Sequence, residues 1–291
     1  MHNKDKRYKY FISIKQKKWL KMNYPILGVK ECSEHVKTSK HFIQTYAYKN
    51  NLKVSHKKRS QISREHAIKQ FAIVRQQREY DAQLITIITP EQSYILGYLW
   101  GDGHLAKANI KTSLYYAQLE IVTEDMNDIK EYLNSLGRWK IHSRQRTGKE
   151  ISCAMCFDNV LGLFLKINKY DKKSTEDPCL ILSKIPTEIH KYFWRGYCDA
   201  DGCFYVNKNL KRQTFSICGH YIQPWTSIEM VLKELNVKYS LCIGKNSKNQ
   251  KHSSISIYNI DGIRKFGNFI YGDKKELCLK RKYEKFLQII G

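Results

Sequence analysis

Long apolar runs are missing from this chain of 291 residues. A helix that crosses a membrane needs about 20 consecutive apolar residues, so membrane insertion is not expected. The start of the chain, Met1 to Arg7, is polar and basic and lacks the apolar segment of a secretory signal peptide. Nine cysteines without such a signal favour free thiols in a reducing compartment, and we expect a cytoplasmic protein.

Paired metal-binding cysteines are also scarce. Cys153 and Cys156 have C-x-x-C spacing, but no second pair follows them at the distance typical of a zinc site. The residues around them alternate in the manner of a β-strand. These features favour ordinary strand cysteines over a structural zinc site.

Acidic residues are few for a chain with so many basic ones. The sequence has 51 lysines and arginines but only 27 aspartates and glutamates, which leaves a net charge of +24 at pH 7. Residues 1–85 contain 20 of the basic and six of the acidic residues, so both this segment and the remainder are basic. This charge favours a nucleic-acid partner, because bound lysines and arginines release counterions from the phosphates. The alternative is a basic surface that serves only solubility.

Two stretches of the sequence repeat one another. Residues 95–103 read ILGYLWGDG and residues 194–202 read WRGYCDADG, with Asp102 and Asp201 in equivalent positions. Each stretch predicts a helix that ends at the glycine after the aspartate, where a left-handed cap is easy. Small residues recur four positions apart in both helices and would let two helix backbones approach closely. These small residues are Gly97 with Gly101, and Gly196 with Ala200.

The repeated aspartates indicate a chemistry. If the two helices pack together, Asp102 and Asp201 emerge side by side, and two carboxylates that close repel each other unless a cation lies between them. Their hard oxygen atoms favour Mg²⁺, and on a strongly basic chain such a pair indicates phosphodiester hydrolysis. A single Asp-Gly at a helix end could be a simple cap, but two matched copies favour the metal site.

With these residues, the chain resembles the single-chain LAGLIDADG homing endonucleases, which carry two copies of the motif. The resemblance covers residues 88–291, about two thirds of the chain. The second copy matches the family pattern well, whereas the first departs from it at Trp100 and Gly101, where the pattern has Asp and Ala. The resemblance implies an α+β fold in which two pseudo-symmetric αββαββα halves, 88–185 and 186–291, form a DNA-binding saddle.

The resemblance also implies roles for particular residues. Asp102 and Asp201, with the main-chain carbonyls of Gly101 and Ala200, would hold Mg²⁺, for which Mn²⁺ could substitute. The family uses basic residues near the scissile phosphates, and three lysines resemble them by position: Lys173, Lys280 and Lys282. Asp199 is interpreted as a neighbour of the site or a cap, because the first copy has a tryptophan in that place.

The N-terminal segment 1–54 predicts a small all-α helix-turn-helix domain. We expect one helix that ends near Met22 to Pro25, another over 27–36, a turn at 37–39 with Thr38 or Ser39 as cap, and a third helix over 40–51. Two helices joined by a tight turn on a basic chain are typical of this DNA-binding motif, although many helical hairpins bind nothing. The expected recognition face consists of Lys40, His41, Gln44, Thr45, Tyr48 and Lys49.

A basic linker and a bridging helix are expected over residues 55–87. Lys57, Lys58 and Arg59 belong to a run of positive charge that we interpret as a linker along the phosphate backbone. A solvated charge run is the alternative. Residues 65–82 predict the helix that leads into the catalytic half.

Alternating strands predict the surfaces that would contact DNA. Each half is expected to run helix, two strands, helix, two strands, helix, with one open face on each sheet. In the first half, the residues expected on the open face are Arg138, Lys140, His142, Arg144 and Arg146. In the second half, they are Tyr205, Asn207, Thr214 and Ser216.

These observations predict a monomeric, Mg²⁺-dependent, site-specific endonuclease that cuts double-stranded DNA. Intein splice residues are not evident at the ends of the sequence, so an intron-encoded or free-standing enzyme is favoured. Three alternatives remain at this level. They are a non-cleaving DNA-binding regulator of the same fold, an RNA-splicing maturase, and a nickase whose two centres differ because Trp100 and Asp199 differ.

Overall fold

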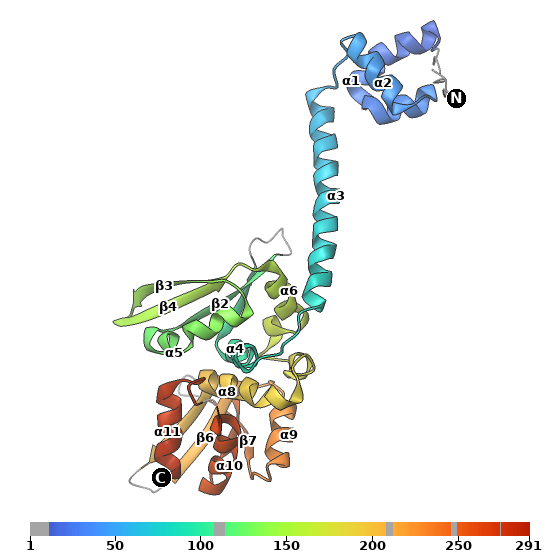
Figure 1. Ribbon diagram of the computed structural model, residues 1–291. Helices are drawn as coiled ribbons and strands as arrows, with labels where there is room; N and C mark the ends of the chain where they lie inside the picture. Colours follow the sequence, from blue (N-terminus) through green and yellow to red (C-terminus); the bar gives the residue numbers. More distant parts are fainter. Residues whose placement is uncertain (1–11, 108–113, 208–211, 246–248, 274) are drawn as a thin grey trace, which may run out of the picture. The chain divides into compact units, whose positions relative to one another are not determined.

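The computed structural model describes residues 12–107, 114–207, 212–245, 249–273 and 275–291. The chain divides into two compact units, Met1–Gln76 and Gln77–Gly291 (Figure 1). Each unit has its own cluster of buried apolar side chains. Over the described ranges, none of the helices has the length and apolar character needed to cross a membrane.

The first unit is helical. It contains α1 (Ile14–Val36), α2 (Lys40–Lys49) and the start of α3 (His56–Gln83). Leu20, Cys32 and Ile43 form its buried core with Ala47. A three-residue turn joins α1 to α2, and the Ser39 hydroxyl caps α2 by accepting a hydrogen bond from the N–H of Phe42.

The break within α1 lies later than the sequence predicts. We expected a helix end near Met22 to Pro25, but Pro25 lies inside the helix, and the non-helical residue is Gly28, with φ 83° and ψ −170°. Glycine adopts a positive φ without steric cost, whereas proline is fixed near −65°. The chain therefore turns at the glycine.

The expected linker is a helix. α3 begins at His56, so Lys57, Lys58 and Arg59 lie in its first turns. The whole of α3 contains neither glycine nor proline, and the Ser55 hydroxyl accepts a hydrogen bond from the N–H of Lys58 at its start. With a cap present and no helix breaker, the basic run is helical, and the helix expected over residues 65–82 begins earlier, at His56.

The second unit has the α+β fold predicted from the sequence. Each half holds a four-stranded antiparallel sheet, with order β1-β2-β4-β3 in the first and β5-β6-β8-β7 in the second. The first half comprises α4 (Pro90–Gly101), β1 (Gly103–Lys107), β2 (Tyr115–Val122), α5 (Thr123–Leu133), β3 (Trp139–Arg146), β4 (Lys149–Cys156) and α6 (Asn159–Ile167). The second comprises α8 (His190–Asp201), β5 (Gly202–Asn207), β6 (Arg212–His220), α9 (Thr226–Glu234), β7 (Ser240–Lys245), β8 (Lys251–Ile257), α10 (Ile260–Tyr271) and α11 (Lys280–Ile290).

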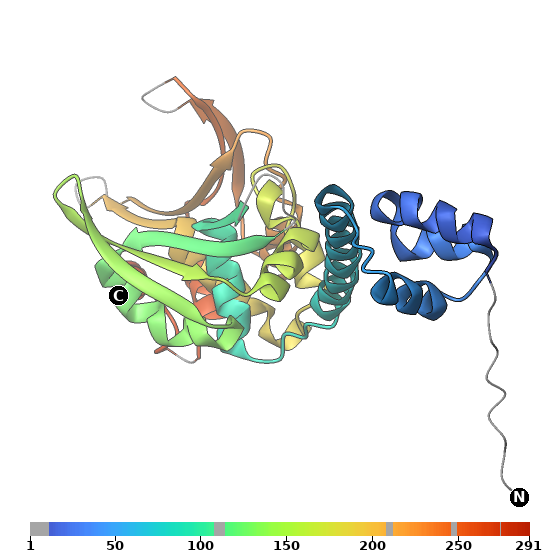
Figure 2. The ribbon, with the colours of Figure 1, turned by 90° about the horizontal axis from the view of Figure 1, so that it is seen from above.

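The two halves repeat each other in register. Gly103, directly after the first aspartate, pairs with Leu119, and Gly202 pairs with Ile217 in the same relation. Short helical segments connect the halves: η2 (Tyr170–Lys172), α7 (Cys179–Leu182) and η3 (Thr187–Ile189). The two sheets curve around one concave side of the unit (Figure 2). This is the pseudo-symmetric arrangement of helices and strands that the repeat predicts.

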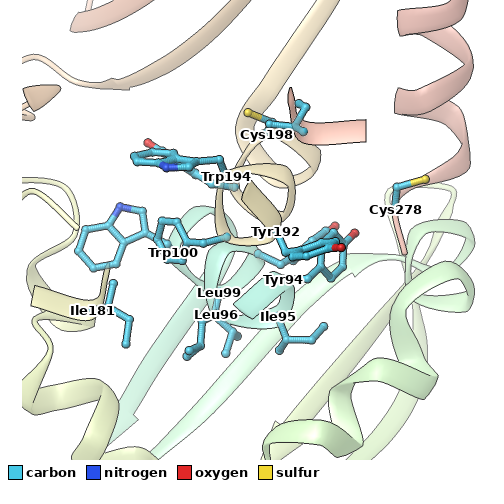
Figure 3. Packing of buried hydrophobic residues seen from close by; sticks show 14 of the residues in the cluster. Tyr94, Ile95, Leu96, Leu99, Trp100, Ile181, Tyr192, Trp194, Cys198 and Cys278 are labelled. Atoms are coloured by element: carbon cyan, nitrogen blue, oxygen red, sulfur yellow. The ribbon is translucent and has the colours of Figure 1, made fainter. Parts of the chain in front are cut away.

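Helices α4 and α8 pack directly against each other at the junction of the halves. A Cβ atom on Gly97 would overlap the carbonyl oxygen of Phe193, and one on Gly196 would overlap that of Tyr94. The core around this contact contains buried residues from both helices, including Trp100 and Trp194 (Figure 3). The predicted close approach of the helices through small residues is therefore observed.

Candidate active site

The two repeated aspartates lie at the ends of α4 and α8. Asp102 is the C-cap of α4, and its main-chain N–H donates to the carbonyl oxygen of Tyr98. Asp201 is the last residue of α8. Gly101 faces the Ala200 side chain, and Oδ2 of Asp201 lies 3.3 Å from where a Cβ on Gly101 would be. Both carboxylates are exposed. The helix contact thus brings two acids together on an accessible surface.

The pKa values of both acids are raised. The pKa of Asp201 is raised to about 6, first by partial burial among protein atoms and then by the neighbouring charge of Asp102, against the opposing effect of Lys173 and Lys282. Burial is also the main cause of the raised pKa of Asp102. Each carboxylate is thus harder to ionise than an ordinary aspartate, and their titrations are coupled.

A lysine approaches each of the two helix ends. Lys173, between η2 and α7, donates from Nζ to the carbonyl oxygens of Gly103, at 2.6 Å, and of Gly101. Lys282, on α11, donates to the carbonyl oxygen of Gly202 in the second half. Burial lowers the pKa of Lys173 to about 8 despite the attraction of the two aspartates. Burial, followed by the charge of Arg281, lowers the pKa of Lys282.

Lys280 does not reach the aspartates. Its side chain is 81% exposed, and its Nζ lies 3.3 Å from Oδ1 of Asp128 on α5. The cause is the phase of α11, because residues two positions apart on a helix face different directions. Of the lysines predicted near the acids, the structure therefore brings Lys173 and Lys282 to the site and leaves Lys280 outside it.

Arg281 and Asp125 are part of the site and were missed by the sequence reasoning. Arg281 of the second half makes two hydrogen bonds of 2.6 Å to the buried carboxylate of Asp125 in the first half. Both charges act on Asp102, since Asp125 raises its pKa and Arg281 lowers it. With Asp102 and Arg146, they line a pocket of about 340 Å³. The only sequence signal was the place of Arg281 between the two lysines.

The oxygen donors at this site fit a hard divalent cation. Among the residues that the structure describes, no group of three or more His, Cys, Asp or Glu side chains could hold a metal ion. A metal that needs a full set of protein ligands is therefore a poor fit, whereas Mg²⁺ is commonly held by one or two carboxylates with waters and substrate phosphates. Asp102 and Asp201 can supply those carboxylates. The carbonyl of Gly101 would be shared with Lys173.

The open face of the first sheet is basic. The strand register puts the outward residues of β3 on the same face as Glu120 and opposite to buried Ala117 and Leu119. Arg144 and Arg146 each form an ion pair with Glu120, at 2.7 and 2.8 Å. These hydrogen bonds lower the pKa of Glu120. The exposed basic residues at or beside this face are Arg138, Lys140, His142, Arg144 and Arg146.

Among the described side chains, the open face of the second sheet carries two histidines, His220 and His252, but no lysine or arginine. Tyr205 is exposed, and Thr214 and Ser216 are half-buried, while the side chain of Asn207 lies outside the described part of the chain. Three exposed cysteines share this face by register: Cys203 opposite Ser216, and Cys218 and Cys242 opposite Ser254. The two faces thus present different chemistry.

The predicted recognition helix has its polar residues outward. Ile43 and Ala47 of α2 are buried. The residues on the other faces are Lys40, His41, Gln44, Tyr48 and Lys49, which are exposed, and Thr45, which is half-buried. In α3, Lys57 and Arg59 are exposed, but the Lys58 ammonium lies 2.7 Å from a carboxylate oxygen of Glu31. Lys58 is therefore already paired within the first unit.

Solved structures similar to this chain include several proteins bound to DNA. The homing endonuclease I-WcaI bound to its DNA recognition sequence is 17% identical with a TM-score of 0.47, over 71% of this chain and 90% of that chain. The LAGLIDADG meganuclease I-AabMI bound to uncleaved DNA is 14% identical with a TM-score of 0.46, over 69% and 89%. I-DmoI in complex with DNA and Ca is 17% identical with a TM-score of 0.42, over 68% and 97%. No protein-family model matches the sequence, and neither does any curated protein.

Proposed function

We propose that this protein is a site-specific endonuclease that hydrolyses both strands of double-stranded DNA with Mg²⁺. The observation that carries the proposal is the pair of aspartates at the ends of the closely packed helices α4 and α8, each accompanied by a lysine. This pair lies between two sheets of a strongly basic protein. The presence of both acids and both lysines favours an enzyme over a binding protein of the same fold.

In this proposal each half supplies one catalytic centre. Asp102 and Asp201 would hold the metal, which when bound would activate a water molecule and stabilise the charge of the leaving oxygen. Lys173 and Lys282 direct their ammonium groups to the ends of the motif helices, where a scissile phosphate would lie. The raised pKa values of the aspartates are consistent with a site at which a bound cation would stabilise the ionised carboxylates.

The two open faces would bind the DNA on either side of the centres. On the first sheet, Arg138, Lys140, His142, Arg144 and Arg146 would contact phosphates and base edges. On the second sheet, Tyr205, Thr214 and Ser216 would make mainly hydrogen bonds and apolar contacts, together with Asn207. Binding is therefore expected to weaken steeply as salt is raised, and chiefly through the first sheet.

The N-terminal unit is proposed to be a second DNA-binding module. The outward residues of α2 include Gln44 and Lys49, which can read base edges or contact phosphates. The three-residue turn before α2 and the serine cap of α2 support this proposal. Gln44→Ala should weaken binding to one sequence more than to others, and Lys49→Ala should weaken binding to all sequences alike.

Cleavage of supercoiled DNA tests the proposal. The plasmid would carry the uninvaded counterpart of the gene's own locus, and the protein would be added with Mg²⁺ or Mn²⁺. A linear product from the wild type, lost in Asp102→Asn and in Asp201→Asn, is the expected result. Tight binding without any cut in either metal would refute the endonuclease and leave a regulator, whereas binding to RNA in preference to DNA would favour a maturase. Light scattering of the purified protein checks the expected monomer.

A further inference from the structure

The second motif helix carries a buried carboxylate that the first lacks. Asp199 on α8 is fully buried, whereas the equivalent residue on α4 is Trp100. Three neutral donors reach the Asp199 carboxylate. They are the hydroxyl of Tyr94 at 2.9 Å, the hydroxyl of Tyr271, and the main-chain N–H of Leu279 at 2.8 Å. Burial of a carboxylate is costly unless the group is hydrogen-bonded, and these three donors supply its hydrogen bonds.

The Leu279 contact fixes the start of α11. Leu279 is buried and directly precedes the helix, and Lys282 follows in its first turn. Arg195, one turn before Asp199 on α8, donates to the carbonyl oxygens of Leu277, at 3.1 Å, and of Asp273, at 2.7 Å. The same side of α8 therefore holds the chain segment that leads into α11. Three residues after Leu279, the Lys282 ammonium donates to the carbonyl oxygen of Gly202.

The first half positions its lysine by other means. Tyr170, three residues before Lys173, packs edge-on against Trp100 with ring centroids 5.0 Å apart. Its hydroxyl donates to the carbonyl oxygen of Leu96 at 2.9 Å. Within the described chain, the indole N–H of Trp100 has no hydrogen-bond partner. Aromatic packing thus supports Lys173, and a buried carboxylate supports Lys282.

We propose that Asp199 is a positioning residue for the second catalytic centre alone: it holds Leu279 and thereby places the Lys282 ammonium at the end of α8, where it donates to the carbonyl oxygen of Gly202. This inference rests on the proposed endonuclease function. Removal of the carboxylate leaves the Leu279 N–H and two tyrosine hydroxyls without their acceptor in a buried place, so the start of α11 shifts. A displacement of about 1 Å at a reacting centre can cost about 100-fold in rate. Only the strand cut by the second centre should suffer.

The test compares the two strands in one reaction. A duplex containing the target found with the wild type is labelled on each strand, and cleavage rates are measured for Asp199→Ala, Asp199→Asn, Lys282→Met and Lys173→Met. Lys282→Met identifies the strand whose cleavage depends on the second centre. We expect Asp199→Ala to slow cleavage of that strand by about tenfold or more. The other strand, which Lys173→Met slows, should change by less than about threefold. Asp199→Asn should retain more activity, because its amide oxygen can still accept from Leu279.

A loss of stability alone gives a different pattern. Trp225→Phe is the matched control, because it removes a buried hydrogen bond to Ser253 elsewhere in the second half, and it should affect both strands alike. Equal slowing of both strands by Asp199→Ala, or slowing of neither, overturns the inference. If thermal unfolding shows that the Asp199→Ala variant is not folded, the ratio of the cleavage rates of the two strands is measured for Asp199→Asn and interpreted in the same way. A wild type that cuts neither strand overturns the proposed function itself.

Discussion

The contact between the two motif helices makes a strong prediction for Gly196→Ala. The added methyl group would overlap the carbonyl oxygen of Tyr94 and approach the amide nitrogen of Tyr98 at 2.7 Å. Both atoms belong to the backbone of α4, so no side-chain rotation relieves the clash. The two helices must move apart, and the buried side chains around them lose contact.

The expected cost follows from the overlap. Forced overpacking of a core costs about 1–3 kcal/mol, and a clash with backbone belongs at the upper end, so we expect about 3 kcal/mol. For a unit that spans residues 77–291, this corresponds to a fall in the unfolding midpoint of about 6–12 °C. Gly97→Ala should cost a similar amount, because its methyl group would overlap the carbonyl of Phe193. The double variant should cost less than the sum, since both changes separate the same two helices.

Thermal or urea unfolding followed by circular dichroism measures these differences. Gly244→Ala is the control, because its methyl group would meet only the ring of His252, at 3.3 Å, which is the movable end of a side chain. We expect that control to stay within about 0.5 kcal/mol of the wild type. If Gly196→Ala has as little effect as this control, α4 and α8 do not approach each other as described. The conclusion that their contact brings Asp102 and Asp201 together is then refuted.

Three further predictions concern charge. The pKa of Asp201 is raised to about 6, so its ionised form destabilises the metal-free protein above pH 6, and this penalty disappears as the pH falls to about 4. In EDTA, Asp201→Asn should therefore be more stable than the wild type at pH 8, by about 1 kcal/mol after allowance for solvent screening. This difference in the free energy of unfolding should vanish near pH 4. Equal unfolding curves for the two proteins at both pH values would contradict the raised pKa. Arg281→Ala leaves the buried carboxylate of Asp125 without its partner and should cost about 2 kcal/mol in urea unfolding, whereas Arg281→Ala combined with Asp125→Asn should recover part of that cost. Glu120→Gln releases the two arginines that it pairs with and should tighten DNA binding and steepen its salt dependence in anisotropy titrations; an unchanged salt slope would mean that those arginines do not face phosphate.

The sequence predicts most of the fold because its signals are local. The alternation in β2 and the capping residues of α4 each depend on residues within a few positions of each other, and the repeated motif is found by comparing two stretches of nine residues. The open face of β3 was likewise predicted, since alternation alone decides which side chains share a face. These features need no knowledge of distant contacts.

The parts that were missed depend on contacts between distant residues. Arg281 lies 156 positions from Asp125, and no spacing rule connects them. Lys58 was expected to face phosphate, but Glu31, 27 positions earlier, already pairs with it. The choice between Lys280 and Lys282 depended on the phase of α11, which is fixed by packing against the rest of the second half.

The unlike open faces of the two sheets give the proposed complex a direction. A duplex with two identical half-sites would meet arginines and lysines on one side and, among the described side chains, hydroxyl, thiol and imidazole groups on the other. The first sheet is suited to strong phosphate contacts, and the second to close fit against base edges. A single chain of this kind is therefore matched to a target that is not a palindrome, and it would bind that target in one orientation. In the proposed enzyme, the order of the two half-sites along the DNA would then decide which strand each catalytic centre cuts.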